Sequence, residues 1–249
     1  MPRLVPFRLA AACSLALILA LSLCAAAVAK GPRAELRVVG KGGKVLAERS
    51  LAAGTAAVKA SPKAGCFGPG TGGSGKRVTV KGANALSLLI RAAQSTAALR
   101  PLLITDAFDF GLGLCGIGGQ VPPSTGFWYL KVNHENPELG GESVKVKKGD
   151  EVLWYLSPDF EATPVELSLR APDLVAKGRP FGVRVFAYDD KGKRKPAAGV
   201  KVSGAAGPTD ARGRAMVTLA GPARLIARHG RDIPSNREAV CVGGKCPGR

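Results

Sequence analysis

Aromatic residues, histidines and acidic residues are all scarce in this 249-residue chain. Phe, Trp and Tyr make up 5% of it, His occurs twice, and 18 Asp and Glu stand against 36 Lys and Arg. Few aromatics beside 33 glycines argue against a large enzyme core and favour small β-rich domains with many turns. After the first 29 residues no second long apolar run occurs, so the sequence predicts no further transmembrane span.

The excess of basic residues gives a net charge of +18, which favours salt-sensitive attraction to anionic polymers. No helix-turn-helix, zinc-finger or aromatic-interleaved basic motif occurs, so no specific nucleic-acid partner is predicted. The densest basic cluster consists of Lys191, Lys193, Arg194 and Lys195. It is either a basic patch or a solvated hairpin tip. The predicted partners are an anionic cell-wall polymer or another exported protein.

Residues 1–29 have the three-part pattern of a secretory signal peptide. Arg3 and Arg8 give a positive start, residues 9–28 carry no charge, and Ala27-Val28-Ala29 supplies the small residues of a cleavage site. A retained membrane anchor is the alternative, because an apolar run of this length can span a bilayer. A lipoprotein is disfavoured because the bulky Leu23 precedes Cys24. The chain is predicted to be secreted or associated with the cell surface.

Four cysteines remain after the signal, and an even number in an exported chain predicts disulfides. They are Cys66, Cys115, Cys241 and Cys246. Three connectivities are open, of which Cys66–Cys115 with Cys241–Cys246 is favoured because each pair lies within one region. A metal site is the rival interpretation. No CxxC pair occurs and only His134 and His229 could assist, so neither a metal nor a cofactor is predicted.

The first half of the chain reads as strands with one helix. Asn84 is a candidate helix cap, and the apolar residues Leu86, Leu89, Ile90, Ala93 and Ala97 form one stripe of an amphipathic helix. Strands are predicted on both sides of it by β-branched, aromatic and alternating apolar residues. The predicted strands are 35–40, 44–51, 127–133 and 151–156, and residues 52–75 and 111–119 are predicted loops.

Residues 34 to about 157 resemble the transcobalamin-C-terminal-like domain, a bacterial family of unknown function. The resemblance rests on the opening hairpin, Val78-Thr79-Val80, the helix 83–95, the stretch Cys115-Gly116-Ile117-Gly118-Gly119, and the segments 127–133 and 146–155. It implies a β-grasp-like fold with a helix across a sheet. Trp128, Tyr129, Gly118 and Gly119 are then the candidate ligand-facing residues.

This chain departs from the cobalamin carriers that contain a related domain. It has no room for their large helical domain, and the family's usual Asn-Gly turn is Asn133-His134 here. Residues 162–242 resemble an immunoglobulin-like or prealbumin-like β-sandwich of bacterial surface proteins, through the turn Thr209-Asp210-Ala211-Arg212-Gly213-Arg214-Ala215. Short strands are predicted there over 165–169, 182–188, 199–203, 215–219 and 223–227.

The complete prediction is a mainly β chain with one helix, of the α+β class. It comprises a signal peptide (1–29), a β-grasp-like domain (30–160), a small antiparallel β-sandwich (162–242) and a C-terminal tail (243–249). No catalytic residue is predicted. His134 and His229 lack the context of a catalytic triad and are predicted to be surface turn histidines, and Asp106 and Asp109 are either paired carboxylates or part of a structured loop. The predicted function is an exported, non-catalytic binding or interaction protein. The alternative is a carrier, or an accessory domain, for a small corrinoid-like ligand.

Overall fold

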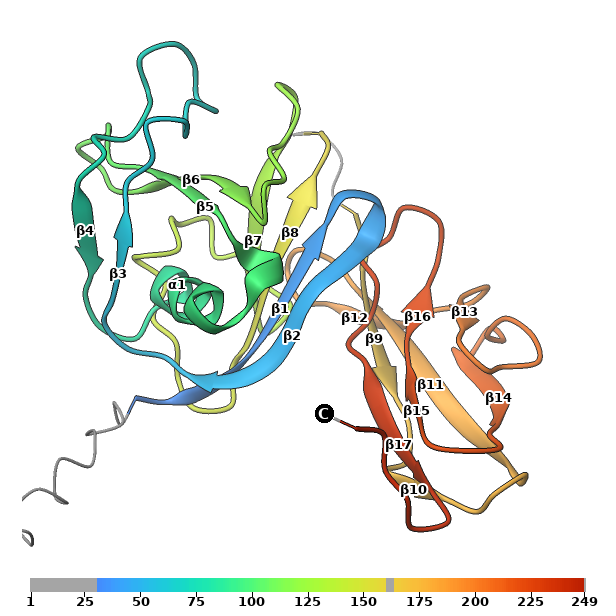
Figure 1. Ribbon diagram of the computed structural model, residues 1–249. Coiled ribbons are helices and arrows are strands. Elements are labelled where there is room, and N and C mark those ends of the chain that lie inside the picture. The colour runs from blue at the N-terminus through green and yellow to red at the C-terminus, as the bar shows by residue number, and fades with distance from the viewer. Residues whose placement is uncertain (1–30, 160–163, 249) are drawn as a thin grey trace, which may run out of the picture. The chain divides into compact units, whose positions relative to one another are not determined.

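The computed structural model describes residues 31–159 and 164–248, so the predicted signal peptide lies outside the described residues. From Gly31 onward the chain forms one compact unit (Figure 1). The described residues contain one α-helix and many strands in several sheets, which is the mainly β, α+β class that the sequence predicts. Among the described residues, no helix is both long and apolar enough to cross a membrane.

A four-stranded mixed sheet organises the first half of this unit, with strand order β2-β1-β8-β7. Its strands are β1 (Arg33–Gly40), β2 (Lys44–Ala52), β7 (Phe127–Val132) and β8 (Glu151–Ser157). The two central strands, β1 and β8, run parallel, and the outer strands pair antiparallel to them. A 3₁₀ turn over Lys41–Gly43 (η1) joins β1 to β2. The helix packs against this sheet, and together they enclose the first hydrophobic core.

Helix α1 (Ala85–Ser95) begins at the predicted cap. The Asn84 side chain accepts the Ser87 N–H at 2.8 Å, and the Ser87 hydroxyl accepts the Asn84 N–H at 3.1 Å. Such reciprocal capping satisfies two backbone donors that the helix start leaves unpaired. The helix ends at Ser95 and a 3₁₀ turn, η2 (Ala97–Leu99), follows. It is therefore slightly shorter than the predicted apolar stripe, which extended to Ala97.

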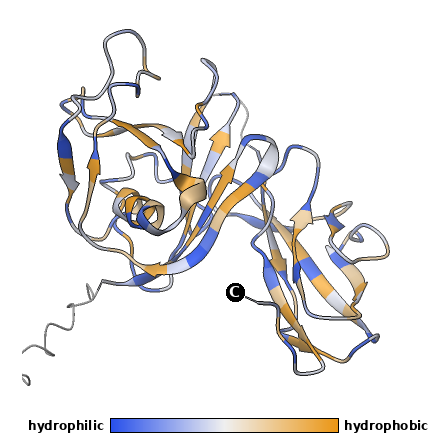
Figure 2. Cartoon of the chain, viewed as in Figure 1, coloured by the Kyte–Doolittle hydropathy of each residue, from blue (hydrophilic) through white to orange (hydrophobic). Residues whose placement is uncertain are grey.

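The helix buries its apolar stripe in the first core, where Leu86, Leu89 and Ile90 join sheet residues such as Leu36 and Trp154. Figure 2 shows this pattern as hydrophobic segments on α1 and on the neighbouring strands. Burying a side chain of this size contributes about 1.5–3 kcal/mol. Packing against the sheet, more than intrinsic propensity, therefore holds an 11-residue helix that would be marginal alone.

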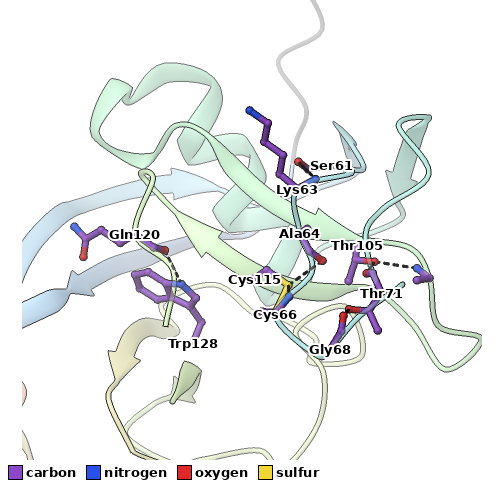
Figure 3. Close-up of a disulfide and its surroundings, with 11 residues drawn as sticks. Ser61, Lys63, Ala64, Cys66, Gly68, Thr71, Thr105, Cys115, Gln120 and Trp128 are labelled. Carbon is purple, nitrogen blue, oxygen red and sulfur yellow. Dashed lines mark hydrogen bonds between the residues drawn. A yellow bond between two sulfur atoms is a disulfide. The ribbon is translucent and has the colours of Figure 1, made fainter. Parts of the chain in front are cut away.

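Two short hairpins lie where the sequence predicted loops or gave no clear structure. They are β3 (Ala56–Lys59) with β4 (Arg77–Val80), and β5 (Leu102–Thr105) with β6 (Gly113–Ile117). The Cys66–Cys115 disulfide joins the loop after β3 to β6, with the two Cα atoms 5.3 Å apart (Figure 3). The predicted pairing is confirmed, and the bridge fastens a glycine-rich loop to a hairpin.

The residues after 164 form small sheets around a second core that includes Leu167, Val185 and Val217. Strand β11 pairs with β9 on one edge and with β12 and β14 on the other; β10-β17-β15 and β13-β16 are separate sheets. All these strand pairs are antiparallel except β10 with β17. The strands are β9 (Glu166–Arg170), β10 (Leu174–Val175), β11 (Pro180–Tyr188), β12 (Arg194–Pro196), β13 (Lys201–Val202), β14 (Arg214–Thr218), β15 (Ala223–Leu225), β16 (Ala227–Arg228) and β17 (Glu238–Val242).

The second disulfide, Cys241–Cys246, closes the turn that follows β17, with a Cα–Cα distance of 4.1 Å. The described part of the predicted tail, residues 243–248, is thus tied back to β17 through Cys246. The predicted domain boundary at residues 160–162 lies outside the described residues. The division into two domains therefore stays a prediction, although each part has its own buried core.

Candidate binding surfaces

Three arginines stand side by side across the exposed face of the β9-β11-β14 strands. Arg184 on β11 is the direct register partner of Arg170 on β9 and of Arg214 on β14. Neighbouring strands lie about 4.8 Å apart, and side chains that oppose each other point to the same face. Arg214 pairs with Asp210 at 2.9 Å. Among the described residues, no carboxylate lies within ion-pair distance of Arg170 or Arg184. We call Arg170, Arg184 and Arg214 the arginine row.

A groove of about 650 Å³ adjoins the arginine row, and Pro208 and the exposed Met216 contribute its apolar wall. Beside the row, Arg170, Arg184 and Arg194 place their guanidinium carbons 5.6, 5.8 and 4.7 Å from the centre of the Phe186 ring. Guanidinium groups that stack on an aromatic ring are held in place while their N–H donors stay available. The surface is thus suited to anions with planar or multiple oxygen acceptors.

The predicted basic patch is divided between a turn and this sheet face. Lys191 and Lys193 lie in the β11–β12 turn, where Asp189 Oδ1 accepts their backbone N–H groups at 3.0 and 2.9 Å. These hydrogen bonds, that of Lys193 foremost, hold the pKa of Asp189 below its usual value. Arg194 and Lys195 belong to β12, and only Arg194 contacts Phe186. Arg194 thus links the predicted patch to the arginine row.

An aromatic pocket of about 410 Å³ lies between β6 and β7 and contains both predicted aromatic residues. Trp128 is 6% exposed, and its indole N–H donates to the Gln120 carbonyl at 3.3 Å (Figure 3). The Tyr129 hydroxyl lies 3.2 Å from Asp190 Oδ2 and also accepts a hydrogen bond from Asn136. We call this cavity the aromatic pocket; Tyr129 contributes its ring while its hydroxyl is engaged elsewhere.

Gly118 and Gly119 do not line the aromatic pocket. Both adopt positive φ, 62° and 74°, in the turn that follows β6. The Gly118 N–H donates to the carbonyls of Leu99 and Pro101, and a Cβ on Gly118 would lie 2.2 Å from the Ala98 oxygen. These contacts give Gly118 a role in backbone packing rather than in contact with a ligand.

A buried ionic cluster joins β1, β7 and β9. The Arg37 guanidinium pairs with Glu166 and donates to the Pro234 carbonyl at 2.7 Å. Lys131, fully buried, lies 3.1 Å from Asp190 Oδ1 and 3.8 Å from Glu166 Oε2, and donates to the Asp189 carbonyl at 3.0 Å. Buried charges require such pairing because desolvation of a lone ion costs several kcal/mol. We call Arg37, Lys131, Glu166 and Asp190 the ionic cluster.

His134 adjoins the ionic cluster; it lies in a turn, but its side chain is largely buried, unlike that of the surface turn histidine that the sequence predicts. Its side chain is 16% exposed, its Nδ1 lies 3.0 Å from Glu166 Oε1, and its ring stacks on Tyr188 at 3.6 Å. The nitrogen and the carboxylate are close without the alignment of a regular hydrogen bond. His134 also has φ of 73°, a conformation that favours glycine. Its side-chain contacts offset this strain, which explains why the turn keeps a histidine.

Burial and neighbouring charges oppose each other at Glu166. Burial by itself raises the pKa of Glu166, but His134, Arg37 and Lys131 outweigh it and bring the pKa below its usual value. Glu48 behaves in the opposite way: burial raises its pKa although it accepts the Arg237 N–H at 2.7 Å. Glu166 is therefore a structural anion of the ionic cluster.

The remaining candidate polar residues are dispersed. His229 pairs with Asp232 at 2.9 Å on the surface. Asp106 accepts both the hydroxyl and the backbone N–H of Ser74, which holds its pKa below the usual value, and Asp109 is exposed in the loop before β6. The described residues contain no group of three or more His, Cys, Asp or Glu arranged to hold a metal ion.

Comparisons with protein-family models, with curated proteins and with solved structures gave no match to this chain. The resemblance to transcobalamin-like domains therefore stays a prediction from the residues quoted above.

Proposed function

We propose that this chain is an exported, non-catalytic binding protein that engages an anionic cell-surface polymer through its C-terminal sheets. The observation that carries this proposal is the arginine row. Like charges directly opposite each other on a sheet destabilise it, yet three arginines share this face, and within residues 31–159 and 164–248 only Arg214 has an acidic partner. We infer that a bound anion compensates the electrostatic repulsion among these three arginines.

The chemistry of arginine supports this assignment. Each guanidinium presents a rigid fork of N–H donors that matches the oxygen pairs of phosphate and carboxylate groups. Because the three arginines lie on neighbouring strands, their guanidinium groups recur at the strand spacing across this face. A polymer with repeated anionic groups could therefore contact several forks at once, which strengthens binding beyond that of one site.

Export is the second part of the proposal. Two disulfides and the lack of a membrane-spanning helix among residues 31–159 and 164–248 are compatible with an extracellular protein. The signal-like residues 1–29 support the same location. The non-catalytic assignment rests on the dispersal of His134, His229, Asp106 and Asp109.

Removing one guanidinium group of the arginine row should weaken polymer binding. Arg184→Gln is expected to bind sodium polyphosphate about tenfold more weakly, the loss expected for one charge-assisted hydrogen-bonding group. The matched control is Lys63→Gln, which removes the same charge from an exposed position in the loop after β3. Co-sedimentation or fluorescence titration of the purified protein measures both affinities. Equal losses in the two variants would contradict a role for the arginine row and leave only general charge attraction.

A small-ligand carrier is the second candidate, because Trp128 and Tyr129 both line the aromatic pocket. Such pockets are mostly apolar with a few polar groups, as this one is. Equilibrium dialysis against cobalamin tests the corrinoid version of this function. Uptake at micromolar ligand would support it, and no uptake would eliminate that ligand.

A further inference from the structure

The aromatic pocket combines open backbone groups with exposed rings, which is a different arrangement from the arginine row. It lies between Gly113–Leu114 of β6 and Phe127–Leu130 of β7. In the part of the chain that the structure describes, β6 pairs as a strand only with β5, and β7 only with β8. Two strand edges thus border one cavity without pairing to each other.

The hydrogen-bonding pattern shows which backbone groups β7 directs to its open edge. Asn133 N–H donates to the Glu151 carbonyl of β8, so the odd-numbered residues of β7 bond to β8. Val132 faces the other way, since it exchanges both backbone hydrogen bonds with Glu135. By the same alternation, Trp128 and Leu130 direct their N–H and C=O groups to the open edge. Among the described residues, no backbone hydrogen bond outside the β7–β8 ladder involves these four groups.

A further donor in the pocket lacks a partner. Trp154 lines the cavity, and its buried indole Nε1–H has no acceptor among the described residues. Buried donors are nearly always satisfied in folded proteins. A bound group with carbonyl oxygens would satisfy this donor as well as the edge N–H groups of β7.

Large apolar side chains are exposed around the same pocket. Phe110 is 88% exposed, Leu139 61% and Phe67 54%. Phe108 connects two of them, stacking on Phe110 at 4.9 Å and meeting Phe67 edge-on at 5.3 Å. Contiguous exposed rings of this kind mark an interaction surface.

The charge around the pocket has one sign. Glu138 lines it, Asp109 lies between Phe108 and Phe110, and no Lys or Arg is among the lining residues. This is unusual in a chain with a net charge of +18. Carboxylates beside aromatic faces attract Lys and Arg side chains, through ion pairs and cation–π contacts.

We propose that the open edge of β7 and the aromatic pocket bind an extended basic-aliphatic segment of another polypeptide, which adds as a strand beside β7. Its backbone pairs with Trp128 and Leu130, its apolar side chains cover the phenylalanine rings, and its cations approach Glu138 and Asp109. Strand addition supplies affinity through main-chain hydrogen bonds and specificity through pockets for alternate side chains. This site is independent of the arginine row.

The test uses fluorescent peptides of strand length with the purified protein, read by anisotropy. An alternating Lys-Val peptide is expected to bind at least about tenfold more tightly than an alternating Glu-Val peptide of the same length. This corresponds to a difference of about 1.4 kcal/mol in binding free energy. A Lys-Val peptide N-methylated at every residue keeps its side chains and loses its N–H donors. It is expected to lose at least about tenfold in affinity, because strand pairing needs those donors.

Variants locate the site. Phe110→Ser is expected to weaken Lys-Val binding about tenfold, and the control Leu174→Ser, at another exposed apolar position, in β10, is expected to leave it unchanged. Arg184→Gln should also leave it unchanged, which separates this site from the proposed polymer site. The proposal is overturned if the N-methylated and unmodified peptides bind equally, if the Glu-Val peptide binds as well, or if cobalamin occupies the pocket and the Lys-Val peptide does not bind.

Discussion

Replacing Glu166 by Gln is expected to lower the free energy of unfolding by about 3–5 kcal/mol, because it removes the anion shared by two buried cations. Arg37, 8% exposed, would lose its ion-pair partner, and Lys131, 0% exposed, would keep Asp190 as its ion-pair partner. In a protein of this size the midpoint of thermal unfolding should fall by roughly 10 °C. Urea denaturation and calorimetry measure the change.

The matched control is Glu151→Gln. Glu151 lies 3.8 Å from the other ring nitrogen of His134, but its side chain is 58% exposed. Loss of an exposed partner should change stability by less than about 0.5 kcal/mol. Similar losses in the two variants would contradict a structural role for the ionic cluster.

The decrease of the free energy of unfolding at low pH, here called the acid limb, gives a second measure of how much Glu166 stabilises the fold. Its pKa is lower in the folded protein than the usual 4.5, so its stabilising contribution is complete above pH 4.5 and disappears as the pH falls through the folded value. Glu166→Gln should therefore flatten this limb. Glu48 and Glu238 have pKa values raised by burial, so their contribution is present at low pH and is lost as the pH rises. They cannot account for a loss of stability in acid.

Removing the Cys66–Cys115 disulfide should have the second large effect. The bridge spans 49 residues of sequence, and loop-closure entropy for that length corresponds to about 3–4 kcal/mol. The double variant Cys66→Ala/Cys115→Ala should lose about this much stability and loosen the segment that carries Phe67. The Cys241–Cys246 bridge closes a much shorter loop, so Cys241→Ala/Cys246→Ala should lose only about 2 kcal/mol. Equal losses would contradict the dependence on loop length.

Sequence reasoning succeeded where the signal is local. Asn84 and the apolar stripe predict α1 because a cap and a period of 3.6 residues are both read within a dozen positions. The alternation in Glu151–Ser157 predicts β8 for the same reason. Strands β5 and β6 were missed because β5 has only four residues and glycines interrupt the pattern of β6, and because their pairing depends on each other and on the nearby disulfide.

The candidate sites depend on register, which a single sequence does not show. Arg170, Arg184 and Arg214 each follow a polar-outward pattern, but only pairing through β11 makes them neighbours. The ionic cluster brings together residues from four segments, as in the contact of Arg37 with Glu166 across 129 positions. Lys131 did give a signal: a lysine inside the otherwise apolar strand FWYLKV is expected to have a buried partner.

The most direct test of the central claim is the salt dependence of polyphosphate binding by the wild type and by the triple variant Arg170→Gln/Arg184→Gln/Arg214→Gln. If these three guanidinium groups bind the polymer, the affinity of the wild type should decrease steeply as the salt concentration rises. The slope should also be smaller by roughly two to three units in the triple variant, because each lost ionic contact reduces the slope by about one. Identical slopes for the two proteins, or wild-type binding that does not respond to salt, would contradict the assignment of the arginine row as the polymer-binding surface.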